Sequence, residues 1–292
     1  MNDVQVNFNE DSLIMLNACI AFIMFSVALH LRWENLKYVF SNPRGVIVGL
    51  ASQLLFLPIL TILLILIIKP SPAMAAGMLL LCACPGGNVS NFFSLVGRGN
   101  IELSITLTTI SSFSSVFITP ILFVAMSSMV LSDEQGSFSL PFMDSLITIG
   151  WVILIPAITG MLFARWKPAI ADKIKRPLQS ISMLILTVFI IIAVKNNWEV
   201  FTSVHPSNLL WVILHNGLAF FGAFGLATLL KRPKQDRLTI GLETSTQNTG
   251  LGLMIVFNFF DANPIIAVIL AFWGTWHMVS GYIFARIFRV PN

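Results

Sequence analysis

The chain has 292 residues, of which 56% are hydrophobic and only 10% are charged. A water-soluble domain cannot carry this much apolar surface, so the composition excludes an ordinary soluble enzyme and favours a protein embedded in lipid. The formal net charge of +4 comes from basic residues scattered over short segments and not gathered into a patch. We therefore expect the lipid bilayer as a partner, and we expect no nucleic acid.

Apolar stretches long enough to cross a hydrocarbon core of about 30 Å recur along the whole chain. They occupy residues 13–31, 46–68, 73–96, 101–130, 142–163, 178–194, 208–230, 238–260 and 264–288. The segments between them are too short for a separate soluble domain. The sequence predicts an all-α polytopic membrane protein with about nine transmembrane helices and a single transporter domain over residues 1–292.

The basic residues predict the orientation of these spans, because short cytoplasmic loops are enriched in Lys and Arg. With nine spans and an external N-terminus, only Lys69 and Lys195 of the 17 Lys and Arg fall outside. With one span more or one span fewer, the basic residues would no longer fall mainly on one side of the membrane. We therefore expect a multi-pass protein of the bacterial inner (plasma) membrane with its N-terminus outside and its C-terminus in the cytoplasm.

Two of the stretches are interrupted by polar and helix-breaking residues at mid-membrane depth. The third contains CACPGGNVSN (Cys82–Asn91) and the eighth contains LETSTQNTG (Leu242–Gly250). Opened backbone is tolerated at this depth only inside protein or beside a wet cavity, so both helices should be broken. They lie five spans apart and enter the membrane from opposite sides, which is the relation of inverted repeats around a binding site.

Glu243 is the only acid in the middle of a predicted span. A carboxylate there costs about 3 kcal/mol or more, so it needs a cation, a proton or a partner. A protonated Glu bonded between helices is one interpretation, and a bound hard cation is the favoured one because oxygen ligands are abundant nearby. These are Ser90, Asn91, Ser104 and Thr108. Taken alone, Ser104 and Thr108 are equally consistent with hydroxyls bonded to their own helix.

Three further polar residues are candidates for contact with an anion. Asn88 and Asn248 lie at the two breaks, where free N–H groups of half-helices suit a carboxylate, and each is also a candidate helix cap. His277 lies inside the last span and is either a packing residue or a substrate contact.

The motifs CPGGNVSN, SITLTT, ETSTQNTGL and GLASQLLFLP together resemble the bile acid:sodium symporter (BASS) family over essentially the whole chain. The resemblance implies a fold of inverted repeats with two crossing broken helices and two parts. The panel would contain the spans near 13–31, 142–163 and 178–194. The core would contain the spans near 46–68, 73–96, 101–130, 208–230, 238–260 and 264–288. This chain would correspond to the nine-span members.

The resemblance also implies roles for individual residues. One sodium site would use Ser90, Asn91, Ser104, Thr108 and Glu243. A second would use the side chains of Gln53, Glu243 and Gln247 with backbone oxygens of Thr244 and Thr246. Substrate would contact Asn88, Asn248 and His277. The chain departs from close bacterial relatives at Asn88 and Met278, in the cavity, so its cargo is not fixed by the resemblance.

The function expected from these observations is sodium-coupled import of an organic anion by alternating access. The cargo would be a small carboxylate, such as pantoate or a 2-oxo acid, or a bile-acid-like compound, moved with two sodium ions and without an organic cofactor or an obligate protein partner. A proton-coupled or uncoupled carrier of the same fold is the alternative, and an ion channel is a weaker one. An enzyme is not expected, because there is no HExxH motif and no second intramembrane acid.

Overall fold

The structure is a computed structural model that describes residues 10–29, 38–131, 141–196, 206–260 and 263–291. All regular elements in these ranges are helices, and the single isolated β-bridge pairs Gly86 with Gln247. In chain order the helices are α1 (Glu10–Ala28), α3 (Tyr38–Ser41), α4 (Pro43–Ala51), η1 (Ser52–Phe56), α5 (Leu57–Ile68), α6 (Pro72–Ala83), α7 (Val89–Val96), α8 (Ile101–Val130), α9 (Phe142–Ile149), η3 (Gly150–Leu154), α10 (Ile155–Trp166), α11 (Pro168–Asn196), α13 (Pro206–Leu229), α14 (Lys234–Ser245), α15 (Thr249–Phe259) and α16 (Pro264–Ile287).

Each apolar stretch of the sequence is occupied by one helix or by consecutive helices, which confirms the all-helical class. Five helical runs in the described ranges are individually long and apolar enough to cross a membrane. They are Pro43–Ile68, Ile101–Val130, Ile147–Trp166, Ser207–Leu229 and Pro264–Ile287. Shorter apolar helices, including Pro72–Ala83 and Thr249–Phe259, belong to the interrupted stretches. The number of crossings therefore stays a prediction.

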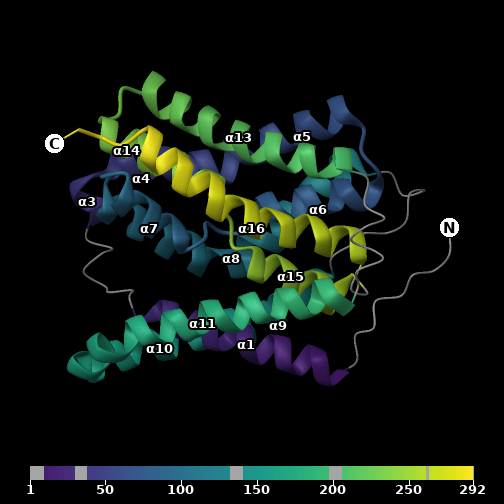
Figure 1. Ribbon diagram of the computed structural model, residues 1–292, viewed down its shortest axis with the longest axis horizontal. Helices are drawn as coiled ribbons and strands as arrows, with labels where there is room; N and C mark the ends of the chain where they lie inside the picture. The colour runs from purple at the N-terminus through teal and green to yellow at the C-terminus, as the bar shows by residue number, and fades with distance from the viewer. Residues whose placement is uncertain (1–9, 30–37, 132–140, 197–205, 261–262, 292) are drawn as a thin grey trace.

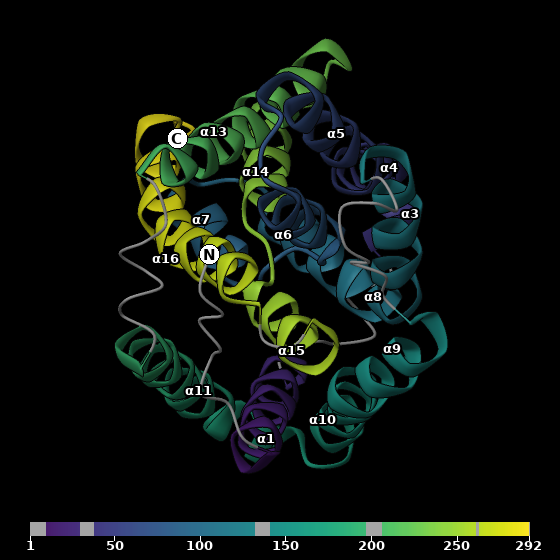
Figure 2. The same ribbon diagram turned by 90° about the vertical axis from the view of Figure 1, so that its right-hand side faces the viewer.

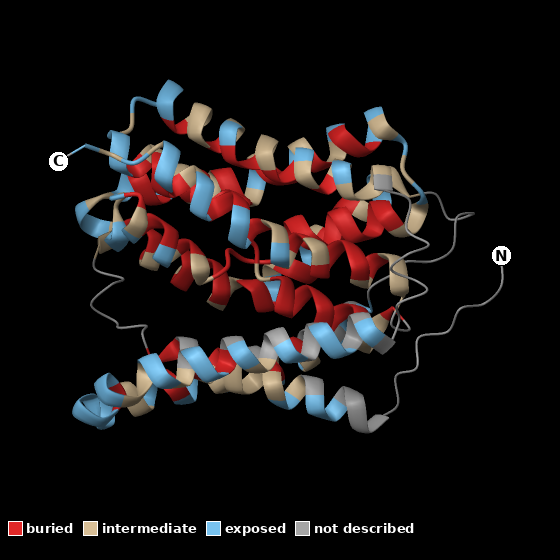
Figure 3. Ribbon diagram, in the orientation of Figure 1, coloured by how far each residue is buried: buried red, intermediate tan, exposed pale blue. Residues whose placement is uncertain are grey.

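The helices form two layers that lie side by side (Figures 1 and 2). One layer contains α1, α9, α10 and α11, with α1 packed against α10 and α11. The other contains the remaining helices and holds most of the buried residues (Figure 3). At its centre, α6 packs against α16 and α8, and its Leu79 and Leu80 are fully buried. The layers meet where α15 touches α1 and where α8 touches α9 and η3.

Two helices contain a π-helical segment that ends two residues before a proline. The π segments are η1, which precedes Pro58, and η3, which precedes Pro156. Proline has no N–H and its ring crowds the preceding turn, so the helix widens there instead of continuing the regular ladder. In η1 this places Ser52 and Gln53 inside the molecule, where both are buried.

The outer faces of the helices are apolar. Along α4 to α5, Leu55, Ile59 and Leu63 are each more than half exposed and recur every four residues, so they form one stripe. In water such a stripe would be a large apolar patch, but against lipid tails it carries no penalty. The surface of the described residues is that of a membrane protein.

Candidate ion and substrate site

The two broken helices meet at their breaks in the middle of the larger layer. Helix α6 ends at Ala83 and α14 ends at Ser245, and Figure 2 shows the extended link from α14 to α15. Gly87 N donates to Thr246 O at 2.7 Å, and Asn248 N donates to Pro85 O at 2.8 Å. This short antiparallel pairing satisfies backbone groups that the broken helices leave free. The prediction of two interrupted helices is confirmed.

Glu243 is almost completely buried, with 1% of its surface exposed, and its carboxylate is surrounded by hydroxyl groups. Ser90 Oγ and Ser104 Oγ both donate to Oε2, the second at 3.0 Å. Thr108 Oγ1 lies 2.6 Å from Oε1 and also 3.0 Å from Ser104 O, so it serves both its own helix and the cluster. Side chains from α7, α8 and α14 thus converge on one carboxylate, which has no ion pair among the described residues.

Asn91 completes this group. Its Oδ1 lies 3.4 Å from Thr108 Oγ1, at the outer side of the hydroxyl cluster, and the residue is half-buried. The structure therefore brings together Glu243 and all four residues that the sequence predicts around it.

A second group of polar atoms lies beside the first. Gln53 Nε2 donates to Glu243 O at 3.3 Å, and Gln247 Nε2 donates to Thr244 O at 2.8 Å. The acceptors of these side chains, Gln53 Oε1 and Gln247 Oε1, are buried without a hydrogen-bond partner among the described residues, as is Thr246 Oγ1. Buried acceptors without donors are costly in a protein interior. These three unpartnered oxygen atoms could be satisfied by a positively charged ligand.

Gly86 provides the space between these two groups. A Cβ atom at this position would lie 2.5 Å from Gln53 Nε2 and 2.6 Å from Glu243 Oε1. Any larger residue would therefore intrude on both side chains. This explains why the break in the first crossing helix contains glycine at this position.

The three candidate substrate residues differ in their surroundings. Asn248 Oδ1 accepts from Leu251 N at 3.1 Å and caps α15, whereas the Asn88 side chain makes no capping bond to α7. His277 is 5% exposed, and its Nδ1 has no partner among the described residues. No hydrogen bond found in the described ranges joins His277 to either asparagine. The capping interpretation thus holds for Asn248 and not for Asn88.

Sequence reasoning missed two residues that support the site. Ser52 Oγ lies 2.8 Å from Thr244 Oγ1, and Asn216 Nδ2 donates to Ser245 O at 2.8 Å while its Oδ1 accepts from Ser280 Oγ. Asn216 thereby satisfies a carbonyl at the broken end of α14. Its position beside His215 in an otherwise apolar stretch, WVILHNGLAFF, is a signal that could identify it from the sequence.

Comparison with known proteins gives consistent relatives. The sequence model of the Sodium Bile acid symporter family matches residues 17–204. A Bacillus subtilis protein described as an uncharacterized sodium-dependent transporter, YocS, is 29% identical over 269 residues, which cover 91% of this chain and 80% of that protein. The hepatic sodium/bile acid cotransporter of Rattus norvegicus is 29% identical over 284 residues, covering 94% of this chain and 76% of that protein.

A plant relative shares a smaller part of its length. The probable chloroplastic sodium/metabolite cotransporter BASS2 of Oryza sativa is 26% identical over 249 residues. The alignment covers 85% of this chain and 58% of the rice protein, so the chain spans little more than half of that relative.

Proposed function

We propose that this chain, which belongs to the Sodium Bile acid symporter family, is a sodium-coupled symporter that imports a small organic anion. The observation that carries the proposal is the buried Glu243 carboxylate, with hydroxyl groups on one side and unpartnered amide and hydroxyl oxygens on the other. The names of the relatives, which describe sodium-dependent transporters of metabolites, organic anions or bile acids, support the same reading.

The first sodium ion would bind between Glu243, Ser90, Asn91, Ser104 and Thr108. A hydroxyl group can rotate, so each Ser or Thr that now donates to the carboxylate can present a lone pair to an incoming cation. The ion then neutralises a charge that has no other counter-ion among the described residues, in a medium where an unpaired charge is costly. Oxygen ligands of this kind select a hard cation.

The second sodium ion would bind at Gln53, Glu243 and Gln247. The unpartnered Oε1 atoms of both glutamines support this site, since a cation would satisfy them without a donor. The carbonyls of Thr244 and Thr246 already accept bonds from Gln247 Nε2 and Gly87 N, and each retains a second lone pair for an ion. The unpartnered Thr246 Oγ1 is a further candidate ligand.

The anion would bind beside the crossing, where α7 and α15 begin. Asn88 supports this placement because its side chain is half-buried and does not cap its own helix. Its amide has no hydrogen-bond partner among the described residues and can donate to a carboxylate, together with the N-terminal dipole of α7. A compact carboxylate such as pantoate or a 2-oxo acid needs little more than these donors. His277 on α16, whose Nδ1 has no partner among the described residues, would be a further contact.

Transport would follow alternating access in the inner membrane, with nine spans, an external N-terminus and a cytoplasmic C-terminus. The layer of α1, α9, α10 and α11 would be the panel, and the other layer would be the core with inverted repeats. Sodium binding orders the crossing, the anion binds beside it, and the layers rock to open the site inward. Two sodium ions with one monovalent anion move one net charge, which the membrane potential drives with about 2.3 kcal/mol per 100 mV.

The deciding experiment is an uptake screen across organic anions in sodium and in potassium at several pH values. Sodium-dependent uptake of a small carboxylate supports the proposal. Uptake that follows the proton gradient and ignores sodium would establish the proton-coupled alternative in its place. Replacing Gln53 or Gln247 by Ala should lower the Hill slope for sodium, and an unchanged slope in both variants would contradict the second ion.

A further inference from the structure

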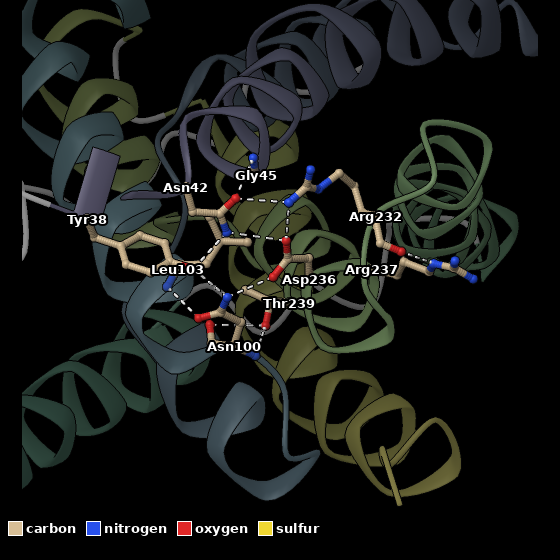
Figure 4. Close-up of polar contacts among 9 residues, drawn as sticks. All are labelled: Tyr38, Asn42, Gly45, Asn100, Leu103, Arg232, Asp236, Arg237 and Thr239. Atoms are coloured by element: carbon tan, nitrogen blue, oxygen red, sulfur yellow. Dashed lines mark hydrogen bonds and ion pairs between the residues drawn. The ribbon is translucent and has the colours of Figure 1, made fainter. Parts of the chain in front are cut away.

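A second polar cluster, drawn in Figure 4, lies where α3, α4 and the start of α14 meet, at one end of the larger layer (Figure 1). Its centre is Asp236, in the first turn of α14, whose side chain is 2% exposed. Asn100 Nδ2 donates to Asp236 Oδ1 at 2.7 Å. Asp236 Oδ2 accepts from Arg232 Nη2 at 2.8 Å and from Asn42 Nδ2 at 3.4 Å. Both carboxylate oxygens are therefore occupied by partners outside α14.

The two asparagines have two roles each. Asn42 Oδ1 accepts from Gly45 N at 3.1 Å and caps α4, while Asn100 Oδ1 accepts from Leu103 N at 3.0 Å and caps α8. Each thus uses its oxygen for its own helix and its NH₂ group for Asp236. Three helix N-termini, those of α4, α8 and α14, meet at one carboxylate, where their dipoles favour a negative charge.

Additional contacts hold this meeting point together. Tyr38 Oη accepts from both Asn42 Nδ2 and Asn100 Nδ2, at 2.7 and 2.6 Å. Asn100 N also donates to Thr239 Oγ1 at 2.8 Å, which ties α8 to α14 a second time. Arg232 supplies the counter-charge and bonds to Asn42 Oδ1 at 2.9 Å. A buried charge with this many partners fixes its neighbours in one geometry.

Five of the nine candidate ion ligands lie on α8, on α14 or on η1, which continues α4. Glu243 follows Asp236 on α14, Ser104 and Thr108 follow Asn100 on α8, and Gln53 follows Asn42 along α4 and η1. At about 1.5 Å per residue, these ligands lie roughly 6 to 16 Å from the cluster along continuous helix. A tilt of about 5° at the cluster would displace a ligand 12 Å away by roughly 1 Å, which exceeds the tolerance of about 0.5 Å of a preorganised site.

We propose that Asp236, together with Asn42 and Asn100, forms a clamp that positions α4, α8 and α14 and thereby sets the affinity of the Glu243 site for sodium. This inference rests on the proposed function, since it assumes that Glu243 binds sodium. Asp236 does not touch the ion. It is a positioning residue that acts through the spacing and tilt of the three helices.

The test uses sodium alone as the probe, so it does not depend on knowing the cargo. The melting temperature of the purified full-length protein is followed as sodium replaces potassium at constant ionic strength, which yields the half-saturating sodium concentration. In Asp236→Asn this concentration should rise by about tenfold, the lower end of the effect expected for residues that orient metal ligands. Asp172→Asn is the matched control, because it removes the exposed ion pair with Lys175, far along the chain from the ion ligands.

Two further variants separate the clamp from simple loss of stability. Asn42→Ser and Asn100→Ser keep an oxygen that can cap the helix but remove the NH₂ group that reaches Asp236. Both should raise the half-saturating sodium concentration. The melting temperature in potassium should fall less in Asn42→Ser, where Asp236 Oδ2 keeps its bond from Arg232, than in Asn100→Ser, where Asp236 Oδ1 loses the donor Asn100 Nδ2. They also serve as the test if Asp236→Asn fails to fold.

The outcomes are distinguishable. If sodium stabilises the wild type and all folded clamp variants show the same half-saturating concentration, the clamp is overturned and the sodium site stands. A clamp variant whose melting temperature in potassium is lower but whose half-saturating sodium concentration is unchanged also overturns the clamp, because Asp236 and its partners would then have a structural role alone. If sodium does not stabilise the wild type more than potassium does, the proposed sodium site falls, and the role of the clamp falls with it.

Discussion

Glu243 carries the only carboxylate in the hydroxyl cluster, so its charge can be tested with little change of shape. Glu243→Gln should abolish both sodium-dependent uptake and stabilisation by sodium, because an amide cannot neutralise a cation in a low-dielectric site. Folding in potassium should be preserved, since the substitution removes a buried charge and keeps the volume. The measurement is the melting temperature in sodium and in potassium, alongside uptake. Retention of wild-type sodium dependence in a folded variant would disprove the assignment.

Gly86 offers an independent test of the same site by steric means. A Cβ atom there would lie within 2.6 Å of Gln53 Nε2 and Glu243 Oε1, so Gly86→Ala should displace these proposed ion ligands without altering their chemistry. We expect sodium-dependent uptake to be lost or strongly reduced. Gly225→Ala is the matched control, because its Cβ would meet no atom within 4 Å. Equal sodium affinity in both variants, measured by thermal stabilisation, would contradict the placement of the site.

At the scale of elements, the two crossing helices begin differently after their breaks. Asn248 caps α15, so Asn248→Ala should lower stability by about 1 kcal/mol, as typical for loss of an N-cap. Asn88 makes no side-chain cap, so Asn88→Ala should leave the melting temperature in sodium nearly unchanged. It should nevertheless remove stabilisation by a small carboxylate, the role proposed for it. Thermal melts with and without the carboxylate measure both effects, and an unimpaired carboxylate response in Asn88→Ala would exclude it as a ligand.

The π segments show how a local sequence rule serves the site. In SQLLFLP, Pro58 favours a widened turn, and that turn carries Ser52 and Gln53 toward α14. The second segment, GWVILIP, precedes Pro156 in the smaller layer and reflects the same chemistry. Proline in these positions thus changes which side chains face inward, and does not end the helix.

For the whole molecule, one of the contacts between the two layers, that of α1 with α15, provides a test of relative motion. Asn17 on α1 and Asn258 on α15 exchange reciprocal amide hydrogen bonds of 3.1 and 3.3 Å. If the layers rock during transport, this contact must separate in part of the cycle. A short bismaleimide joining Asn17→Cys to Asn258→Cys, with Cys19→Ser as background, should abolish uptake while sodium still stabilises the protein. Each single-cysteine variant treated in the same way is the control, and undiminished uptake by the crosslinked protein would rule out rocking at this contact.

Several features could be read from the sequence because they depend on local composition against a lipid environment. The helical stretches follow from apolar runs of membrane length, and the two breaks follow from polar and Pro-Gly-Gly runs within them. The need of Glu243 for a partner follows from its depth alone. Hard-cation chemistry also selects, from the sequence, four oxygen-bearing residues as neighbours of Glu243, namely Ser90, Asn91, Ser104 and Thr108.

Other features were decided only by the tertiary structure. The bonds that link Ser52 to Thr244, Asn216 to Ser245 and Asn100 to Asp236 join residues between 29 and 192 positions apart. Nothing in the residues around Asp236 distinguishes it from an ordinary acid in a basic loop. The different roles of Asn88 and Asn248 likewise emerge only from backbone geometry at each break. The local sequence determines which side chains require a hydrogen-bond partner or a counter-charge. Which residue provides that partner depends on how helices distant in sequence pack, because this packing brings the helix ends together.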